Sequence, residues 1–126
     1  MRAIVIDDSL TIRLALSKHL AGFGFTVEKA DGGVSGLELL DQDPVPDLVL
    51  LDWNMPDMSG FDVLQALRKD PRLKPTKVMM VTSETDVHLM EAAIGAGANE
   101  YLMKPFNPQS LGAKLELLGL SAPSEG

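Results

Sequence analysis

Short apolar runs alternate along the chain with longer segments in which apolar residues recur every three or four positions. Runs of this short kind predict buried strands, and the three-to-four spacing predicts amphipathic helices. The predicted strands cover residues 3–6, 26–29, 48–51, 78–81 and 100–103. Three of these strands are almost wholly apolar, which is typical of parallel strands that helices cover on both faces.

Five helices are predicted between and after these strands, each from apolar residues at helical spacing. These residues are Ile12, Leu16 and Leu20 in the first helix, Leu37 and Leu40 in the second, Val63 and Leu67 in the third, Met90 and Ala93 in the fourth, and Leu111 and Leu115 in the fifth. Strands that alternate with helices require right-handed crossovers. We therefore predict an α/β fold with a doubly wound five-stranded parallel sheet between two helical layers.

Length and composition limit the classes of protein to consider. The 126 residues suit one domain, expected over residues 1–120, with a flexible tail over 121–126. Without cysteine there is no disulfide frame, thiolate zinc site or thiol nucleophile. The formal charge of −7 disfavours nucleic acid as a partner, and no apolar run approaches the ~20 residues of a membrane span. A soluble, cytoplasmic protein is expected.

Polar side chains follow four of the predicted strands. In an open α/β sheet, ligands bind outside the carboxyl ends of the strands, where the strand order reverses. The residues at these ends are Asp7 and Asp8, Asp52, Thr82 and Ser83, and Lys104 with Pro105. If the strand order is 2-1-3-4-5, the first and third strands are neighbours, and three carboxylates crowd one crevice.

This crowding predicts a cation site. Two carboxylates about 4 Å apart repel by about 1 kcal/mol in water and by about 4 kcal/mol at an effective dielectric constant near 20. Either one acid stays protonated or a cation lies among them. Mg²⁺ suits oxygen ligands, and a zinc site is disfavoured because these strand ends carry no His or Cys. With Lys104 and Thr82 nearby, the set fits phosphoryl transfer to Asp52 as the nucleophile.

At this point the residues match a known family. The strand-end residues, in this order and spacing, resemble the receiver domain of two-component response regulators over about residues 2–118. The segments DWNMP (52–56), VTSE (81–84) and KPF (104–106) resemble the CheY-type chemotaxis members. The resemblance implies a flavodoxin-like, three-layer sandwich with strand order 2-1-3-4-5.

The resemblance also implies roles for the site residues. Asp52 would accept a phosphoryl group from a phosphohistidine on a CheA-like sensor histidine kinase. Asp8, Asp52 and the backbone carbonyl of Asn54 would ligate Mg²⁺ directly, and Asp7 would do so through water. Lys104 would pair with the phosphoryl group, following a cis peptide to Pro105.

The remaining implied roles concern signalling. Thr82 and Tyr101 would form a switch that remodels the face made by the fourth helix, the fifth strand and the fifth helix. Asn54 and Glu84 lie where the family tunes the lifetime of the phosphorylated state. The chain would then be a stand-alone, monomeric signalling protein and not an enzyme. It would signal by protein contact, with the flagellar motor switch as the main candidate target and a phosphatase as a further candidate partner.

Plainer interpretations of single residues stay open. Asp7 and Asp8 could cap the first helix, Thr82 or Ser83 could cap the fourth, and Lys104-Pro105 could be a turn. Tyr101 could be an ordinary half-buried strand residue, and Trp53 could either cover the crevice or pack at its rim. Core or loop packing is expected for the methionines Met55, Met58, Met79, Met80 and Met103.

Three rival functions also stay open. A phosphorelay shuttle or a phosphate sink would use the same chemistry. An Mg²⁺-dependent phosphatase of the haloacid dehalogenase type would need two acids one residue apart after the first strand, whereas here the acids are adjacent and residue 9 is Ser. A degenerate receiver could serve as a constitutive binding scaffold, although the complete set of site residues argues against it.

Overall fold

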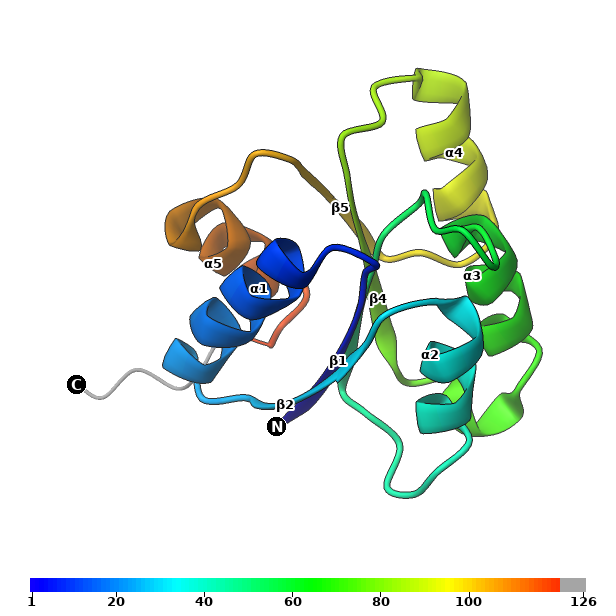
Figure 1. The fold of residues 1–126 in the computed structure, drawn as a ribbon, viewed down its shortest axis with the longest axis horizontal. Coiled ribbons are helices and arrows are strands. Elements are labelled where there is room, and N and C mark those ends of the chain that lie inside the picture. Colours follow the sequence, from blue (N-terminus) through cyan, green and yellow to red (C-terminus); the bar gives the residue numbers. More distant parts are fainter. Residues whose placement is uncertain (121–126) are drawn as a thin grey trace.

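The chain folds into three layers, with the sheet in the middle (Figure 1). The computed structural model describes residues 1–120, and the tail expected over 121–126 lies outside the described residues. All strand pairs are parallel, in the order β2-β1-β3-β4-β5. The predicted fold class and strand order are therefore confirmed.

The helices and strands alternate from β1 to α5, as predicted. Their bounds are β1 (Arg2–Ile6), α1 (Leu10–Gly22), β2 (Thr26–Ala30), α2 (Gly33–Leu40), β3 (Leu48–Leu51), α3 (Gly60–Arg68), β4 (Lys77–Thr82), α4 (Val87–Gly95), β5 (Glu100–Met103) and α5 (Pro108–Leu117). A short 3₁₀ helix, η1 (Pro71–Leu73), follows α3 and was not predicted. β1, β2 and β4 are each longer than expected by one or two residues.

Helices α1 and α5 cover one face of the sheet, and α2, α3 and α4 cover the other (Figure 1). Because successive strand residues point to opposite faces, each strand contributes to both sides of the core. Ala3 and Val5 pack toward α1 and α5, whereas Ile4 and Ile6 pack toward α2, α3 and α4. The central strand β3 is buried along its whole length, which explains why its sequence shows no polar alternation.

Several helices begin at a residue whose side chain accepts a backbone N–H bond. Ser9 caps α1, Ser59 caps α3, Asp86 caps α4 and Asn107 caps α5. The capping role left open for Asp7, Asp8, Thr82 and Ser83 is therefore wrong, because Ser9 caps α1 and Asp86 caps α4.

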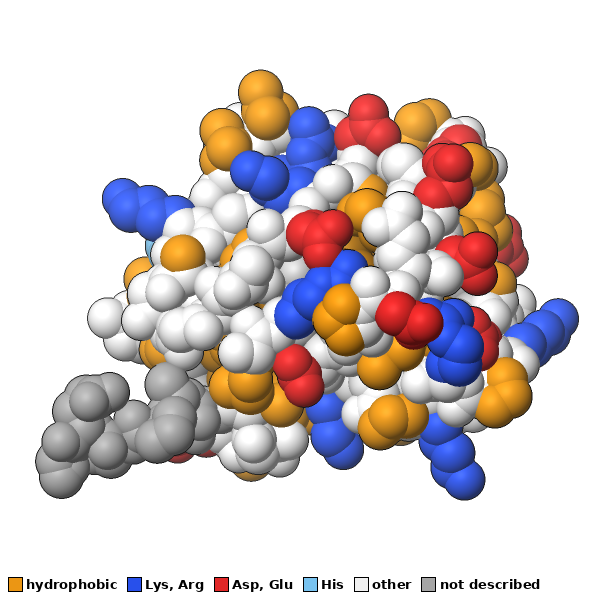
Figure 2. All heavy atoms as spheres, turned by 90° about the horizontal axis from the view of Figure 1, so that it is seen from below, with side chains coloured by type: hydrophobic (Ala, Val, Ile, Leu, Met, Phe, Trp, Pro, Cys, Tyr) orange, Lys and Arg blue, Asp and Glu red, His pale blue; other side chains and the backbone are white. Residues whose placement is uncertain are grey.

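Charges of both signs are mixed on the face shown in Figure 2. Lys and Arg side chains are scattered there among Asp and Glu and do not gather into one basic patch. Among residues 1–120, no helix is both long and apolar enough to cross a membrane.

Arg68, at the end of α3, ties together three segments on the far side of the sheet from α1. Its guanidinium donates hydrogen bonds to the carbonyls of Leu73, Thr76 and Gly97, at 2.8, 2.7 and 3.0 Å, and to Asn99 Oδ1 at 2.9 Å. The side chain is partly buried, so these acceptors would have few alternative partners. Arg68 therefore holds η1 and the α4–β5 loop against α3.

We predict that Arg68→Ala lowers the free energy of unfolding by about 3 kcal/mol, because it leaves several partly buried carbonyls without a donor. Urea denaturation measures the loss. Arg72→Ala is the matched control: Arg72 forms more exposed ion pairs with Asp43 and Asp70, and its removal should cost clearly less than the removal of Arg68. Equal losses in the two variants would contradict this role of Arg68.

Candidate functional site

The sheet fixes the backbone of the residues that follow β1, β3 and β5. The N–H of Asp7 donates to the carbonyl of Ala30 at 3.1 Å, and that of Asp52 to the carbonyl of Ile6 at 3.0 Å. The N–H of Lys104 donates to the carbonyl of Thr82 at 2.9 Å. Each of these residues thus extends the hydrogen bonding of the sheet by one step, so that its side chain starts from a rigid position.

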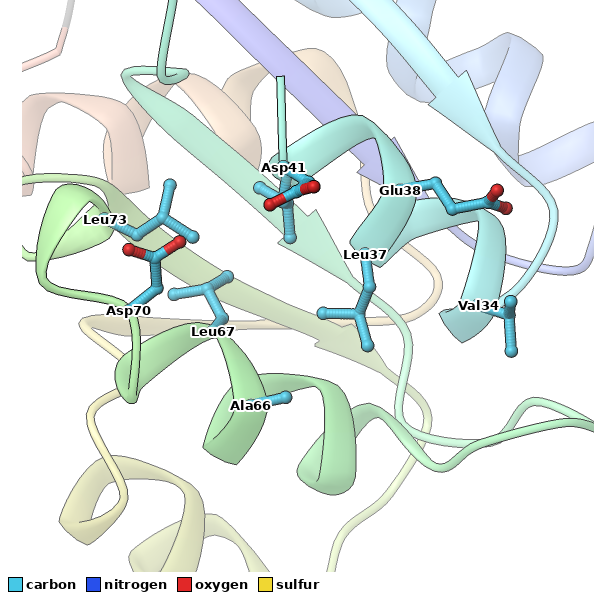
Figure 3. Close-up of a pocket in the computed structure, with 9 residues that line it drawn as sticks. Val34, Leu37, Glu38, Asp41, Ala66, Leu67, Asp70 and Leu73 are labelled. Atoms are coloured by element: carbon cyan, nitrogen blue, oxygen red, sulfur yellow. The ribbon is translucent and has the colours of Figure 1, made fainter. Parts of the chain in front are cut away.

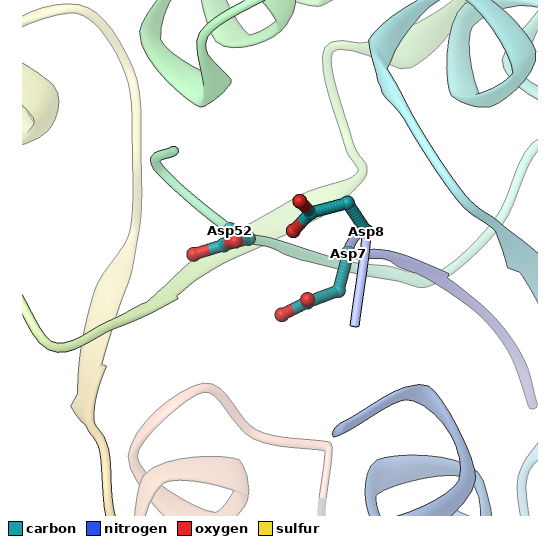
Figure 4. Close-up of side chains that lie close together, drawn as sticks. All are labelled: Asp7, Asp8 and Asp52. Atoms are coloured by element: carbon teal, nitrogen blue, oxygen red, sulfur yellow. The ribbon is translucent and has the colours of Figure 1, made fainter. Parts of the chain in front are cut away.

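Three carboxylates converge at these strand ends (Figure 4). Asp7, Asp8 and Asp52 each offer an oxygen, and the three oxygens lie within 4.8 Å of one another. Asp7 is 1% exposed and Asp52 6%, whereas Asp8 faces solvent. The predicted meeting of the acids is therefore observed, with two of them buried and one open to ligands from solution.

Lys104 supplies the cation of this cluster. Its Nζ lies 3.0 Å from Asp7 Oδ2 and 3.4 Å from Asp52 Oδ1. Its peptide bond to Pro105 is cis, as the resemblance implied. Asp7 is oriented further by the backbone N–H of Ser9, which donates to Oδ1 at 2.9 Å. One ammonium thus balances part of the charge of two buried carboxylates, and Asp8 adds a further negative charge.

Burial raises the pKa of Asp52 above its ordinary value. The neighbouring charge of Asp7 raises this pKa further, and Lys104 opposes both effects by attraction and by its hydrogen bond. Burial and Asp7 thus disfavour the ionised form of Asp52, and an additional positive charge nearby would stabilise that form.

The donor set fits a hard divalent cation. Three carboxylates meet at the edge of the crevice, one of them exposed, and among residues 1–120 the cluster contains no His or Cys. Oxygen-only ligands with an open side to solvent are typical of Mg²⁺ sites, in which the ion keeps several waters.

Thr82 and Tyr101 lie on the side of the sheet that α4 covers. Tyr101 packs in the core cluster that includes Ala93 of α4, and Thr82 is fully buried at the end of β4. Thr82 Oγ1 accepts the backbone N–H of Glu84 at 3.1 Å. The hydroxyl of Tyr101 is buried and has no hydrogen-bond partner among the described residues. The tyrosine is therefore buried and not half-buried, with its hydroxyl inside the protein.

Two of the candidate residues lie in loops beside the cluster. Asn54 is exposed, two residues after Asp52. Glu84 lies two residues after Thr82, and its carboxylate accepts the backbone N–H groups of Thr85 and Asp86. The structure thus joins Lys104 to Asp7 and Asp52 by ion pairs and brings Asp8 within 4.8 Å of both acids. It places Asn54 and Glu84 in the loops that follow β3 and β4.

Comparisons with known proteins agree with this geometry. The sequence matches the family described as the response regulator receiver domain over residues 3–116. It is 38% identical to the chemotaxis protein CheY1 of Helicobacter pylori, over 94% of this chain and 96% of the relative. It is 40% identical to the chemotaxis protein CheY of Pseudomonas aeruginosa, over 92% of this chain and 94% of the relative.

The chain belongs to the response regulator receiver family. A solved structure of the chemotaxis response regulator CheY4 of Vibrio cholerae superposes with a TM-score of 0.87 at 33% identity and covers 93% of this chain and 97% of that one. This receiver therefore shares both the family sequence pattern and its fold over nearly its whole described length.

Some expectations about apolar residues need correction. Met79 and Met80 fill the core as expected, but Met103 is 36% exposed, so the prediction of core filling is wrong there. It ends the edge strand β5 and lies beside a hollow near α4, where no further strand within residues 1–120 covers it. Trp53 packs against Phe61 with ring centroids 5.7 Å apart and is partly buried against the core cluster.

The sequence analysis did not identify two residues that shape the site. Arg13 donates from Nη1 to the carbonyl of Asp7 at 2.7 Å and so fixes the turn that carries the first two acids. Asp57, in the β3–α3 loop, accepts three backbone N–H groups. The only sequence signal for Asp57 was the turn Asp31–Gly33, which leaves α2 without a capping side chain at Gly32.

A separate hollow lies between α2 and α3 (Figure 3). Apolar side chains including Leu37, Ala66 and Leu67 line it, and the carboxylates of Glu38 and Asp70 lie at its margin. None of the acids of the cluster lines it, so this hollow is separate from the cluster at the strand ends.

We predict that Tyr101, the only tyrosine of the chain, titrates above the ordinary tyrosine pKa of 10.0. Burial raises its pKa, and the charge of Glu84 adds to the effect. The folded state therefore holds the phenol proton more tightly than the unfolded state does. The resulting contribution to the free energy of unfolding is fully present below the unfolded pKa and is lost as the pH rises through the higher folded pKa.

The ultraviolet absorbance of tyrosinate, followed against pH in native buffer and in urea, measures this difference directly. The native midpoint should lie above the midpoint in urea. In the Tyr101→Phe control, the free energy of unfolding should fall less steeply above pH 10, since phenylalanine cannot ionise. Coincident midpoints in the two solvents would show that the phenol is not held in the buried state.

Proposed function

We propose that this receiver accepts a phosphoryl group on Asp52 with the help of Mg²⁺ and signals by contact with another protein. The observation that carries the proposal is the meeting of Asp7, Asp8 and Asp52 with Lys104 at one edge of the sheet. A buried carboxylate beside a cation site and a lysine is suited to attack a phosphorus atom.

The reaction would transfer the phosphoryl group between two side chains. An oxygen of Asp52 attacks the phosphorus of a phosphohistidine on a sensor kinase, and the new O–P bond replaces the N–P bond. The imidazole nitrogen leaves with the electron pair of that bond and regains a proton from solvent. The Lys104 ammonium, already 3.4 Å from Asp52, neutralises charge on the transferred oxygens.

We assign the metal ligands to this cluster and to the loop that follows β3. Asp8, Asp52 and the backbone carbonyl of Asn54 would hold Mg²⁺ directly, and Asp7 would do so through a water molecule. The ion supplies positive charge that favours the approach of a phosphoryl group to a site with three carboxylates. Asn54 and Glu84, in the flanking loops, would then tune how readily water reaches the acyl phosphate.

Thr82 and Tyr101 would convert phosphorylation into a change of surface. The phosphoryl group needs a donor, and Thr82 Oγ1 would leave the N–H of Glu84 to supply one. A ligand shifts a conformational equilibrium only by the contacts that differ between the two states. These contacts would act on the conformer in which Tyr101 lies inward, where its buried hydroxyl has no hydrogen-bond partner among residues 1–120.

The output surface would be the face made by α4, β5 and α5. A hollow there is lined mostly by apolar side chains, among them the exposed Val87, Ile94 and Met103. Tyr101 lines the same hollow, so its movement would alter the surface that a partner meets. Exposed apolar area of this kind is typical of a protein-binding site.

The relatives named for chemotaxis support a role in motor control. The partners would be a CheA-like histidine kinase, the flagellar motor switch and a phosphatase, and the receiver would act as a cytoplasmic monomer. It would assist its own phosphorylation and dephosphorylation without being an enzyme in the ordinary sense. A phosphorelay shuttle or phosphate sink would need the same active site, so binding to purified switch protein distinguishes these roles.

We predict that acetyl phosphate and Mg²⁺ add one phosphoryl group to the wild-type chain, because a small acyl phosphate can reach Asp52 without a kinase. Intact mass measures the gain, and fluorescence of Trp53, the only tryptophan, follows the site on the same samples. The gain should disappear when EDTA removes the metal.

Asp52→Asn is the matched control, since it keeps the size of the side chain and removes the nucleophile. It should gain no phosphoryl group under any of these conditions. An equal gain in mass in Asp52→Asn would place the reaction on another residue. No gain in the wild type, even with a competent kinase, would favour the scaffold hypothesis.

A further inference from the structure

Helix α2 begins without a capping side chain of its own. Its N-cap residue is Gly32, and no side chain of α2 or of its N-cap accepts the first backbone N–H groups. Every α-helix leaves its first N–H groups without a partner inside the helix, and a buried start without a cap is costly. Gly32 and Gly33 are both buried, so these donors need acceptors from elsewhere in the protein.

Asp57 supplies the missing acceptors from the β3–α3 loop. Its Oδ1 accepts the N–H of Gly33 at 3.1 Å, and its Oδ2 accepts the N–H of Val34 at 2.9 Å. Oδ1 also accepts the N–H of Met58 at 2.9 Å. These bonds lower the pKa of Asp57, as expected for a carboxylate at the positive end of a helix.

The contact between this loop and α2 is close enough to restrict the residues of α2. A Cβ atom built on Gly32 would lie 2.9 Å from Asp57 Oδ1, and one on Gly33 would lie 2.7 Å from the Cβ of Met58. Side chains at these two positions would push the loop away. The glycines thus allow a loop side chain to take the place of an ordinary N-cap.

The loop held in this way carries a proposed metal ligand. At its start, the N–H of Asp52 is fixed to the carbonyl of Ile6 at 3.0 Å. At its end, the N–H of Gly60 donates to the carbonyl of Trp53 at 2.7 Å. Asn54 lies between Asp52 and the attachment at Asp57, so its carbonyl belongs to a segment anchored on both sides.

We propose that Asp57 is a positioning residue for the metal site: by tying the β3–α3 loop to α2, it orders the segment that presents the carbonyl of Asn54 beside Asp8 and Asp52. This inference rests on the proposed function. A ligand on a loose loop must be ordered when the ion binds, and this ordering weakens binding. Partners that orient metal ligands typically change metal affinity by about 10- to 100-fold when they are lost.

The experiment is a titration of the full chain with Mg²⁺ after EDTA treatment and dialysis, followed by Trp53 fluorescence. We expect Asp57→Ala to bind Mg²⁺ about 10-fold more weakly than the wild type. Asp57→Asn keeps one acceptor oxygen and should recover part of the affinity. Urea denaturation without metal, run on each variant, corrects for any unfolded fraction.

Asp62→Ala is the matched control, since it removes the same charge from the first turn of the neighbouring helix α3. Its Mg²⁺ affinity should stay close to that of the wild type. If Asp57 only stabilised α2, Asp57→Ala would lower the free energy of unfolding and leave the Mg²⁺ affinity unchanged, and this inference alone would be overturned. Absence of any Mg²⁺ response in the wild type would instead overturn the proposed function, and this inference with it.

Discussion

The ion pairs from Lys104 to Asp7 and Asp52 are the interaction on which the site depends. A parallel sheet brings the ends of β1 and β3 side by side, so the carboxylates that follow these strands cannot avoid one another. A buried charge without a partner is strongly destabilising, whereas a paired one is tolerated. Lys104 makes the cluster tolerable by lying 3.0 Å from Asp7 and 3.4 Å from Asp52, yet one cation does not balance three acids.

This incomplete compensation gives the fold its proposed chemistry. The site retains an attraction for a further cation, and burial holds Asp52 at a fixed position and raises its pKa. The core packs on both faces of the same strands, so Asp52 at the end of β3, the proposed nucleophile, and Thr82 and Tyr101, the proposed switch pair on β4 and β5, are attached to one sheet.

The sequence was sufficient to predict the sheet, its helices and the acids that meet at its edge. The spacing of apolar residues and the apolar character of the strands determine those features, since a strand such as Leu48–Leu51 can be stable only when covered on both faces. The exposure of Met103 was not predictable from its own segment, because it depends on β5 being the edge strand, with no strand beyond it in the described part of the chain. Asp57 and Arg68 were missed for a related reason. Each side chain bonds to backbone groups far away in sequence. Every residue has such backbone groups, so the identity of the residue does not indicate which of them will be a partner.

A double-mutant cycle on Lys104 and Asp7 tests the central interaction most directly. In metal-free buffer, urea denaturation should show that Lys104→Met lowers the free energy of unfolding by about 3 kcal/mol, since two buried carboxylates lose their cation. In the Asp7→Asn background the same substitution should cost at least about 1 kcal/mol less, because one of the two charges is already gone. Additive effects, within about 0.5 kcal/mol, would contradict the account and mean that Lys104 does not compensate the acids.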